Sequence, residues 1–476
     1  MPHFDVVVVG CGPAGERAAI QAARADRRVA VVEREHVVGG ARVNWGTIPS
    51  KTLRESALFV HSLTRNRLEG IHCEVASEIT VHDFMYRERA VVQRELELIG
   101  ESLARYRIEV FEGEARLLDA HTVAVCGRDG GVQTALSGEF IILATGASPN
   151  RPVDVPFDGE RVFDSNTILN LPRMPHSMTV LGAGVIGVEF ASIFAALGLD
   201  VTLVDTRDRL LPYLDREIVK ILERELRRLG IKILHNERYA SLERLSGATP
   251  RVRCTTRFGT VLESEVLLYC VGRDGNTKGL GLEVLGLEPN SYGLLTVNEH
   301  YQTAVGHIYA VGDVIGYPAL ASTAMEQGRQ AVRHALGIPG PTGRTEMLPF
   351  AIYTIPEVSY TGATEEALQA NGVEYVVGRG NYDLNPRGQI IGDSEGMLKL
   401  LFAKDGLRLV GAHMIGTNAT ELIHIGQAFL RAGASAPQIA ETLFNYPTLA
   451  DLYRHAALKA ILAMGRSVPA PQTTGS

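Results

Sequence analysis

The sequence predicts an α/β protein with two doubly wound, Rossmann-like nucleotide-binding domains and a C-terminal α+β domain. Two glycine-rich turns of the form G-x-G-x-x-G, at residues 10–15 and 182–187, each stand between an apolar run and a helical pattern. From about residue 349 the pattern changes to strands, expected at 374–379, 397–403 and 408–415, followed by helices. A chain of 476 residues is too long for one hydrophobic core and suits three domains.

Composition narrows the class of partner. Against 47 Lys+Arg stand 54 Asp+Glu, a formal net charge of -7, so no basic excess attracts nucleic acid or an anionic membrane. No run is long enough to span a bilayer, and the opening residues lack the features of a signal peptide. The cysteines are odd in number and never in C-x-x-C spacing; they are Cys11, Cys73, Cys126, Cys254 and Cys270. We therefore expect a cytoplasmic protein without structural disulfides or a zinc site.

The first glycine turn has the features of an anion-binding turn. Residues 4–10 are expected as a buried strand, 13–25 as a helix and 28–33 as the next strand. Glycine permits the tight turn and lets a pyrophosphate approach the free N–H groups at the helix N-terminus. Glu33 ends the second strand, where it can accept a hydrogen bond from a ribose 2′-OH.

The second turn, Gly182-Ala183-Gly184-Val185-Ile186-Gly187, repeats this arrangement. Its acidic residue is Asp205, and in both copies the acidic residue follows the first glycine by 23 positions. A single turn of this type is weak evidence, whereas two copies with identical acidic spacing make a chance match improbable. Between the copies, 80–107 is expected to be helical and 115–140 to form short strands.

Two further motifs carry a family resemblance. Ala144-Thr145-Gly146 is similar to the strand end that closes the first nucleotide unit, and Tyr309-Ala310-Val311-Gly312-Asp313 to the element that places an aspartate on the flavin ribityl chain. In this order they resemble the pyridine nucleotide-disulphide oxidoreductases. The resemblance implies FAD, a nicotinamide dinucleotide substrate, and a homodimer formed through the C-terminal domain, with higher oligomers left open. It divides the chain into an FAD-binding domain (1–150 and 276–345), an NAD(P)-binding domain (151–275), a dimerisation domain (346–466) and a disordered tail (467–476).

The resemblance also assigns the cofactor-binding residues. For FAD they are Gly10, Gly12, Pro13, Ala14, Gly15, Glu33, Arg34, Lys51, Ala115, Thr145, Gly146, Asp313, Leu320 and Ala321. For NAD(H) and NADP(H) they are Gly182, Gly184, Val185, Ile186, Gly187, Glu189, Asp205, Thr206, Arg207 and Gly272. Lys51 and Glu189 are expected as a catalytic ion pair beside the flavin ring, where the lysine ammonium stabilises negative charge. No metal is expected.

The segment 39–51 departs from the family at the positions that carry redox chemistry. Its sequence is G-G-A-R-V-N-W-G-T-I-P-S-K, and the disulphide reductases have cysteines where this chain has Arg42 and Thr47. Near the C-terminus Tyr446 replaces the family's acid-base histidine, and Asp451 stands at the position of the glutamate that orients it. Both halves of the thiol relay are therefore expected to be absent, whereas the nucleotide motifs are complete.

Hydride exchange between nicotinamide dinucleotides is the chemistry that remains. The resemblance implies transfer from NADPH to NAD+, and the reverse, through FAD in a ping-pong reaction without a redox disulphide. Asp205 favours a free 2′-OH, while Arg207 and Arg209 are candidates to hold a 2′-phosphate, although both arginines are equally consistent with surface charges. Two alternatives stay open: an NAD(P)H dehydrogenase or diaphorase that reduces a quinone or dioxygen, and a non-catalytic flavin-bound regulator.

Overall fold

The computed structural model describes residues 1–65, 81–247, 250–340 and 347–465. The chain divides into two compact units. Unit 1 comprises Met1–Ser56, Glu74–Met174 and Leu268–Arg344, and unit 2 comprises Ala57–Cys73, Pro175–Leu267 and Thr345–Ser476. Among the described residues, no helix combines the length and apolarity needed to cross a membrane. The predicted disordered tail lies outside the described residues.

Unit 1 contains a seven-stranded sheet with helices against it. Its elements are β1 (His3–Val9), α1 (Pro13–Ala23), β2 (Val29–Glu33), α2 (Gly40–Asn44), α4 (Val81–Phe84), α5 (Tyr86–Arg105), β3 (Glu109–Glu112), β4 (Glu114–Leu117), β5 (Thr122–Cys126), β6 (Val132–Leu143), β7 (Ala147–Pro149), β8 (Val162–Asp164), β16 (Arg273–Gly275), β17 (Ile308–Ala310) and α8 (Ala321–Ala335), with the 3-10 helices η1 (Thr167–Asn170), η2 (Leu282–Leu285) and η3 (Gly312–Ile315). The helix α3 (Thr47–Arg65) and the strand β15 (Val266–Tyr269) cross the division between the units.

The sheet of unit 1 has the order β3-β2-β1-β6-β5-β4, with β17 also paired to β6. Strand β1 is parallel to β2 on one side and to β6 on the other. Because both of its faces are covered, Phe4, Val6, Val7 and Val8 are fully buried, which explains the continuous apolar run in the sequence.

Strand β6 corrects one expectation. Residues 115–140 were expected to form only short strands, but β6 is 12 residues long. Its first half is antiparallel to β5, and its second half is parallel to β1 and β17. One strand therefore joins the antiparallel and parallel parts of the sheet, an arrangement that a local pattern does not reveal. The expected helix at 80–107 forms as α4 and α5.

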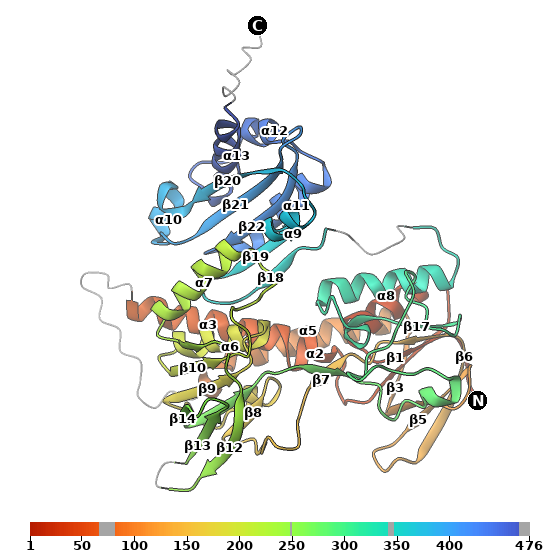
Figure 1. Cartoon of the computed structure of the whole chain (residues 1–476). Helices are drawn as coiled ribbons and strands as arrows, with labels where there is room; N and C mark the ends of the chain where they lie inside the picture. The colour runs from red at the N-terminus through yellow and green to blue at the C-terminus, as the bar shows by residue number, and fades with distance from the viewer. Residues whose placement is uncertain (66–80, 248–249, 341–346, 466–476) are drawn as a thin grey trace, which may run out of the picture. The chain divides into compact units, whose positions relative to one another are not determined.

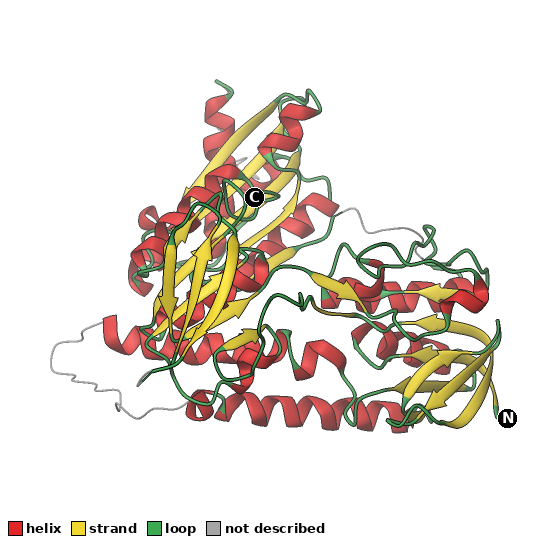
Figure 2. Cartoon of the chain, turned by 60° about the horizontal axis from the view of Figure 1, so that its bottom comes forward, coloured by secondary structure: helices red, strands yellow, loops and turns green. Residues whose placement is uncertain are grey.

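The first part of unit 2 is a second doubly wound sheet. Its elements are β9 (Ser177–Leu181), α6 (Val185–Ala196), β10 (Asp200–Val204), α7 (Arg216–Arg228), β11 (Lys232–Leu234), β12 (Tyr239–Leu245), β13 (Arg251–Thr256) and β14 (Val261–Ser264). Strands β11, β10 and β9 are parallel neighbours and β15 follows them in the sheet, while β12-β13-β14 form a separate antiparallel sheet. Figure 2 shows the strands in yellow and the helices that cover them in red.

The second part of unit 2 is an α+β domain. Its elements are β18 (Phe350–Ile352), β19 (Val358–Gly362), α9 (Glu365–Ala370), β20 (Tyr375–Asn381), α10 (Pro386–Ile391), β21 (Met397–Ala403), β22 (Leu409–Ile415), α11 (Ala419–Arg431), α12 (Ala436–Glu441) and α13 (Leu452–Ala463), with the 3-10 helices η4 (Tyr382–Leu384) and η5 (Leu449–Asp451). The order β18-β19-β22-β21-β20 is antiparallel throughout. Helices α11 and α13 pack on this sheet around Leu400, Phe402 and Tyr453 (Figure 1).

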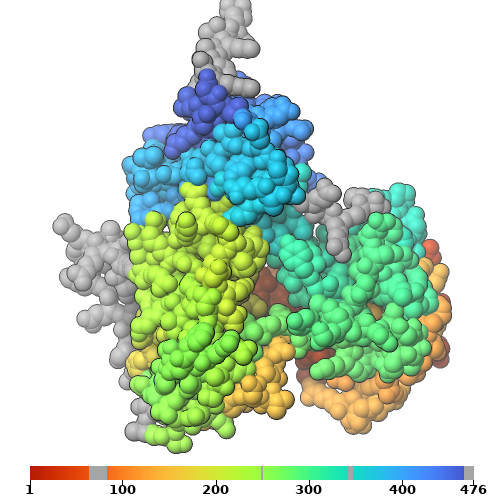
Figure 3. All heavy atoms as spheres, viewed as in Figure 1, coloured from red at the N-terminus to blue at the C-terminus, as the bar shows by residue number. Residues whose placement is uncertain are grey.

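The two parts of unit 2 are in direct contact. Helix α7 packs near β22, and Lys399 of β21 binds Asp215, which caps the N-terminus of α7. In Figure 3 the yellow-green atoms of the first part lie directly against the blue atoms of the second.

Candidate functional site

The first glycine turn connects β1 to α1 with a backbone that only glycine tolerates at two positions. Gly10 has φ +97°, and a Cβ atom there would lie 2.5 Å from the carbonyl oxygen of Ala144. A Cβ on Gly15 would lie 1.9 Å from the carbonyl oxygen of Gly10. At Gly12, by contrast, the nearest atom to an added Cβ is the Cα of Gly40 at 3.8 Å. The turn is therefore tight where the chain folds back and open at the helix N-cap.

Glu33 is fixed by this turn. Its Oε2 accepts a hydrogen bond from the backbone N–H of Cys11 at 2.7 Å, and its Oε1 accepts one from the N–H of Glu35 at 3.1 Å. Burial raises the pKa of Glu33, and these two backbone donors offset part of the increase. The carboxylate is thus positioned at the end of β2, as the sequence predicts for a residue that meets a ribose hydroxyl.

Several polar groups in unit 1 are suited to hydrogen-bond a bound dinucleotide. Helix α1 begins at the N-cap Gly12 and helix α8 at Leu320, and neither N-terminus receives a hydrogen bond from a side-chain cap. These N–H groups fit a pyrophosphate. The hydroxyl Oγ1 of Thr145 is buried and has no hydrogen-bond partner among the described residues, which fits a hydrogen bond to a bound dinucleotide.

The remaining residues predicted to bind FAD also lie in unit 1. Arg34 follows β2 and bonds Glu35, Ala115 is in β4, and Gly146 follows β6 with φ +70°. Asp313 is in η3, where burial raises its pKa and the nearby charge of Arg273 partly opposes that shift. The structure therefore places the predicted FAD set, which runs from Gly10 to Ala321 in the sequence, within one compact unit.

The second glycine turn repeats the geometry of the first. Gly182 has φ +95°, Gly184 is the N-cap of α6 without a side-chain cap, and the N–H of Ala183 donates to Asp205 Oδ2 at 3.0 Å. The N–H of Arg207 donates to Asp205 Oδ1 at 3.0 Å. These two bonds correspond one for one to the bonds that Cys11 and Glu35 make with Glu33.

One feature distinguishes Asp205 from Glu33. The guanidinium of Arg207 donates from Nε to Asp205 Oδ1 at 3.0 Å and from Nη2 to Oδ2 at 2.5 Å. Asp205 is 3% exposed, and burial is the largest single influence on its pKa and raises it. The hydrogen bonds and charge of Arg207, together with the N–H of Ala183, outweigh burial, so the pKa is lowered. Arg209 is differently engaged: it bonds the carbonyl of Pro212 and lies 3.8 Å from Glu366.

The other residues that are predicted to bind NAD(P) lie in both units. Val185, Ile186 and Gly187 form the first turn of α6, and Thr206 is exposed beside Asp205. Gly272 lies in unit 1 with φ +83° and accepts a hydrogen bond from the N–H of Asn150 at 3.2 Å. The glycine turn and Asp205 thus form one group in unit 2, and Gly272 does not belong to that unit.

The predicted catalytic pair also falls in two units. Lys51 is in α3 within unit 1, and its Nζ lies 3.3 Å from Ser50 Oγ. Glu189 is in α6 of unit 2, is 4% exposed, and accepts a hydrogen bond from the N–H of Tyr353 at 2.8 Å. The pairing of Lys51 with Glu189 therefore stays a prediction.

Four residues are predicted to stand where the family has its thiol chemistry. Arg42 is in α2 and forms an ion pair with Glu16, and Thr47 is the first residue of α3. Tyr446 is 77% exposed, and Asp451 pairs with His455 at 3.2 Å. Neither Arg42 nor Thr47 offers a thiol for exchange.

Sequence reasoning missed three groups that position this site. The side chain of Gln327 accepts a hydrogen bond from the N–H of Gly312 at 2.8 Å, and the side chain of Asn276 donates to the carbonyl of Thr145 at 2.9 Å. The third is the backbone N–H of Tyr353 on Glu189. None of these three hydrogen bonds follows from a local sequence pattern, because each joins residues that are distant in the chain or uses a backbone donor.

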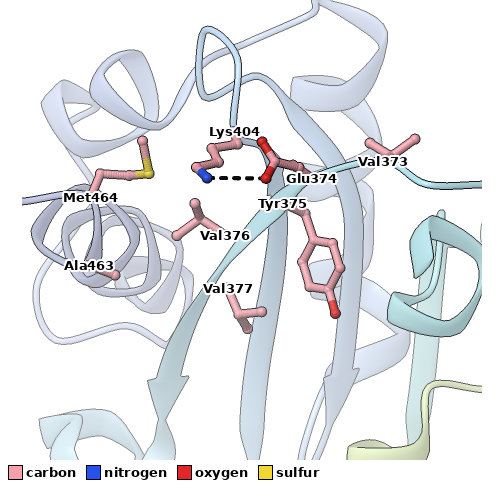
Figure 4. Close-up of a pocket in the computed structure, with 8 residues that line it drawn as sticks. All are labelled: Val373, Glu374, Tyr375, Val376, Val377, Lys404, Ala463 and Met464. Carbon is pink, nitrogen blue, oxygen red and sulfur yellow. Dashed lines mark hydrogen bonds and ion pairs between the residues drawn. The ribbon is translucent and has the colours of Figure 1, made fainter.

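A hollow in the α+β domain contains none of the predicted site residues. It has a volume of about 470 Å³ and lies between the start of β20 and the end of α13. Figure 4 shows its apolar floor at Val376 and Met464 and an ion pair between Lys404 and Glu374, 3.3 Å apart. These groups offer no nucleophile or convergent donors, so we place no chemistry there.

Fold and site together define a class of protein: an α/β protein with two dinucleotide-binding turns and a separate α+β domain. Residues 4–328 match the family described as pyridine nucleotide-disulphide oxidoreductase, and residues 348–457 match its dimerisation domain. The chain belongs to the pyridine nucleotide-disulphide oxidoreductase family. Membership implies use of FAD and of a nicotinamide dinucleotide, and the C-terminal domain supports a homodimer.

Curated relatives narrow the comparison. The chain is 45% identical over 464 residues to a protein of Mycobacterium tuberculosis named soluble pyridine nucleotide transhydrogenase, with 98% of each chain covered. It is 42% identical over 462 residues to a protein of the same name from Yersinia pestis, covering 96% of this chain and 98% of the relative.

Solved structures agree on the fold. LpdA from Mycobacterium tuberculosis superposes with a TM-score of 0.88 at 29% identity, covering 96% of this chain and 99% of that one. The HOCl-induced flavoprotein disulfide reductase RclA from Escherichia coli superposes with a TM-score of 0.84 at 27% identity and the same coverage.

Proposed function

We propose that this chain is a soluble pyridine nucleotide transhydrogenase, which transfers hydride from NADPH to NAD+, and in reverse, through FAD by a ping-pong reaction. The observation that carries the proposal is the pair of acid-terminated glycine turns. With it goes the inference from the family resemblance that Arg42 and Thr47 replace the redox cysteines. The two curated relatives that carry this name support it. A chain without the dithiol keeps hydride exchange and loses disulphide reduction.

The proposed FAD site is the set of residues in unit 1. The N-termini of α1 and α8 bind the pyrophosphate, Glu33 accepts from the adenosine ribose, and Asp313 meets the ribityl chain. When bound, FAD supplies the flavin N5 atom that accepts and returns hydride. The resemblance implies that Lys51, as an ion pair with Glu189, places a positive charge beside the flavin ring, where it stabilises negative charge.

The proposed nicotinamide site is the second glycine turn with Asp205, Thr206, Arg207 and Gly272. The N-terminus of α6 binds the pyrophosphate of either substrate. Asp205 and Arg207 offer an acceptor for a 2′-OH and a cation for a 2′-phosphate at one place, which suits a site that both nucleotides use in turn.

The domain division follows from the same proposal. Residues 1–150 and 276–345 form the FAD-binding domain, 151–275 the NAD(P)-binding domain and 346–466 the dimerisation domain. We propose that the protein is a cytoplasmic homodimer. The match to the dimerisation domain supports the homodimer. The few scattered cysteines, which are free among the described residues, fit a reducing compartment.

Anaerobic stopped-flow spectroscopy tests the proposal. The purified FAD-loaded protein is mixed with NADPH and then with NAD+, while the flavin absorbance is followed. Rapid bleaching by NADPH and rapid recovery with NAD+ are expected. Bleaching by NADH alone, with recovery only when a quinone is added, would replace the proposal with a diaphorase. Slow bleaching by both nucleotides would indicate a non-catalytic flavoprotein.

A further inference from the structure

Arg42 takes part in a buried ion pair that joins three helices of unit 1. Its Nη2 lies 3.1 Å from Oε2 of Glu16 in α1, and its Nη1 lies 3.9 Å from Oε2 of Glu95 in α5. The side chains of Arg42 and Glu16 are 13% and 3% exposed. A pair this shielded from solvent interacts more strongly than an exposed one, and loss of one partner leaves the other charge uncompensated.

Glu16 is placed where its charge opposes the function of the turn. It lies in the first turn of α1, the helix whose uncapped N-terminus follows the first glycine turn. The charge of Glu16 acts on Cys11, a residue of the turn. Burial is the main cause of the raised pKa of Cys11. The charges of Glu33 and Glu16 raise this pKa further, and the charge of Arg42 lowers it. An uncompensated carboxylate here would repel a pyrophosphate anion.

The backbone holds α2 against the same turn. Gly40, two residues before Arg42, has φ +55°, and a Cβ atom there would lie 2.7 Å from the Cα of Gly12. This close approach of two glycines fixes the start of α2 beside the N-cap of α1. Arg42 therefore reaches Glu16 from a segment that is itself anchored to the turn.

A second arginine is near Glu16 but is less suited to neutralise it. Arg17 Nη2 lies 3.6 Å from Glu16 Oε1, and its side chain is 36% exposed. The longer distance and the contact with solvent both weaken its effect relative to Arg42.

We propose that Arg42 is a positioning residue for FAD, whose guanidinium neutralises Glu16 and so keeps the first glycine turn receptive to the pyrophosphate. The inference rests on the FAD site proposed above and is independent of the electron acceptor. It gives the position occupied by a redox cysteine elsewhere in the family an electrostatic role in this chain.

The affinity of the apoprotein for FAD tests this role. FAD is removed from the full-length protein, and the dissociation constant is measured by titration with FAD, following the quenching of flavin fluorescence. Arg42→Met is expected to raise the constant at least about 10-fold, because the buried charge of Glu16 keeps only the more distant and more exposed Arg17. Arg42→Lys keeps a cation and is expected to stay within about 3-fold of the parent. Arg94→Met is the matched control, because Arg94 forms an exposed pair with Glu97 at 3.1 Å in α5.

A compensating change separates neutralisation from simple packing. Arg42→Met/Glu16→Gln is expected to recover FAD affinity to within about 3-fold of the parent, since the buried carboxylate of Glu16 beside the turn is no longer present. Glu16→Gln alone, in which Arg42 keeps Glu95, is expected to bind FAD as tightly as the parent, and it tests the proposal even if Arg42→Met does not fold.

Three results would overturn the inference. They are FAD binding by Arg42→Met within twofold of the parent, failure of the second substitution to recover affinity, and a loss of affinity in Glu16→Gln as large as in Arg42→Met. A protein that passes these tests but fails the stopped-flow experiment would refute the proposed transhydrogenation and leave the role of Arg42 intact.

Discussion

The guanidinium of Arg207 donates one hydrogen bond to each carboxylate oxygen of Asp205. The backbone N–H groups of Ala183 and Arg207 donate two more, so this carboxylate accepts four hydrogen bonds. Glu33, the equivalent residue of the first turn, accepts two backbone hydrogen bonds and, within the part of the chain that the structure describes, none from an arginine side chain. Asp205 is therefore fully engaged, and a ribose 2′-OH gains access to it only when Arg207 gives up a bond. A 2′-phosphate, by contrast, is attracted by the guanidinium.

Arg207→Ala is predicted to weaken NADPH binding selectively. The variant loses a charge-assisted bond to the 2′-phosphate and leaves the negative charge of Asp205 unopposed, so the dissociation constant for NADPH should rise about 10- to 100-fold. That for NADH should change little, because Asp205 becomes free to accept from the 2′-OH. NADPH and NADH would reduce the bound FAD, so the oxidised, FAD-loaded protein is titrated with the redox-inert fragments 2′,5′-ADP and 5′-AMP, which carry and lack the 2′-phosphate.

The control for that prediction is Arg216→Ala, which removes an exposed arginine paired with Glu366 at 3.3 Å. It should alter neither constant. If Arg207→Ala weakened the binding of both nucleotides equally, the assignment of the 2′-phosphate to Arg207 would be refuted. If Arg209→Ala lost as much NADPH affinity as Arg207→Ala, both arginines would bind the 2′-phosphate.

Local sequence predicted much of this site, because its central bonds are local in the fold. A glycine turn followed after 23 residues by an acid implies neighbouring parallel strands, and the bonds from Cys11 to Glu33 and from Ala183 to Asp205 follow from that geometry. The fork of Arg207 on Asp205 was not predicted, since the same arginine was equally consistent with an exposed surface charge.

Long-range partners could not be predicted from one sequence. Lys399 and Asp215 are 184 positions apart, and Tyr353 and Glu189 are 164 apart. No period or motif links such residues; packing of α7 and α6 against the C-terminal domain brings them together. The same reason explains why the ion pair of Arg42 with Glu16 was not foreseen, although Arg42 was recognised as a departure from the family.

Lys399→Met is predicted to destabilise the protein strongly. Lys399 Nζ lies 2.8 and 2.9 Å from the two oxygens of Asp215 and 3.0 Å from Glu217, and it also bonds Glu365. Its side chain is fully buried, and so is that of Asp215. Removing the ammonium leaves the buried carboxylate of Asp215 without its cation, which should cost about 3–5 kcal/mol of unfolding free energy. Thermal unfolding of the FAD-loaded protein measures the loss.

Lys404→Met provides the comparison for Lys399→Met. Lys404 pairs with Glu374 at 3.3 Å, and both side chains are exposed, so its loss should cost less than about 1 kcal/mol. If the two variants unfolded at the same temperature, the cluster around Lys399 would not hold α7 to the C-terminal sheet.

His413→Gln is predicted to reduce the pH dependence of stability between about pH 8 and 5.5. Burial lowers the pKa of His413 below its ordinary 6.5, and the charge of Lys399 lowers it further. The charges of Asp215 and Glu366, and the hydrogen bond from Nε2 to the carbonyl of Ala363, raise this pKa but do not cancel the decrease. Below pH 6.5 the unfolded chain binds a proton here that the folded chain does not, so stability falls as the pH decreases.

Glutamine can donate to the same carbonyl without titrating. The melting temperature of the variant should therefore fall less than that of the parent between pH 8 and 5.5, and His424→Gln, at an exposed position of α11, should behave like the parent. An identical decrease in all three proteins would exclude His413 as a source of the acid sensitivity.

Gly328→Ala is predicted to disturb the FAD site through the contact between α1 and α8. A Cβ atom on Gly328 would lie 2.2 Å from the carbonyl oxygen of Ala14 and 3.2 Å from the N atom of Ala18, so the helices must separate. Overpacking of this kind typically costs about 1–3 kcal/mol. Because Ala14 belongs to the first glycine turn, FAD affinity should fall as well.

Gly100→Ala in the exposed part of α5 is the control. A Cβ atom there meets no atom within 4 Å, so the substitution should instead stabilise the protein by up to about 1 kcal/mol. Melting curves and FAD titrations of both variants measure these effects, and unchanged FAD affinity in Gly328→Ala would show that the turn tolerates separation of the two helices.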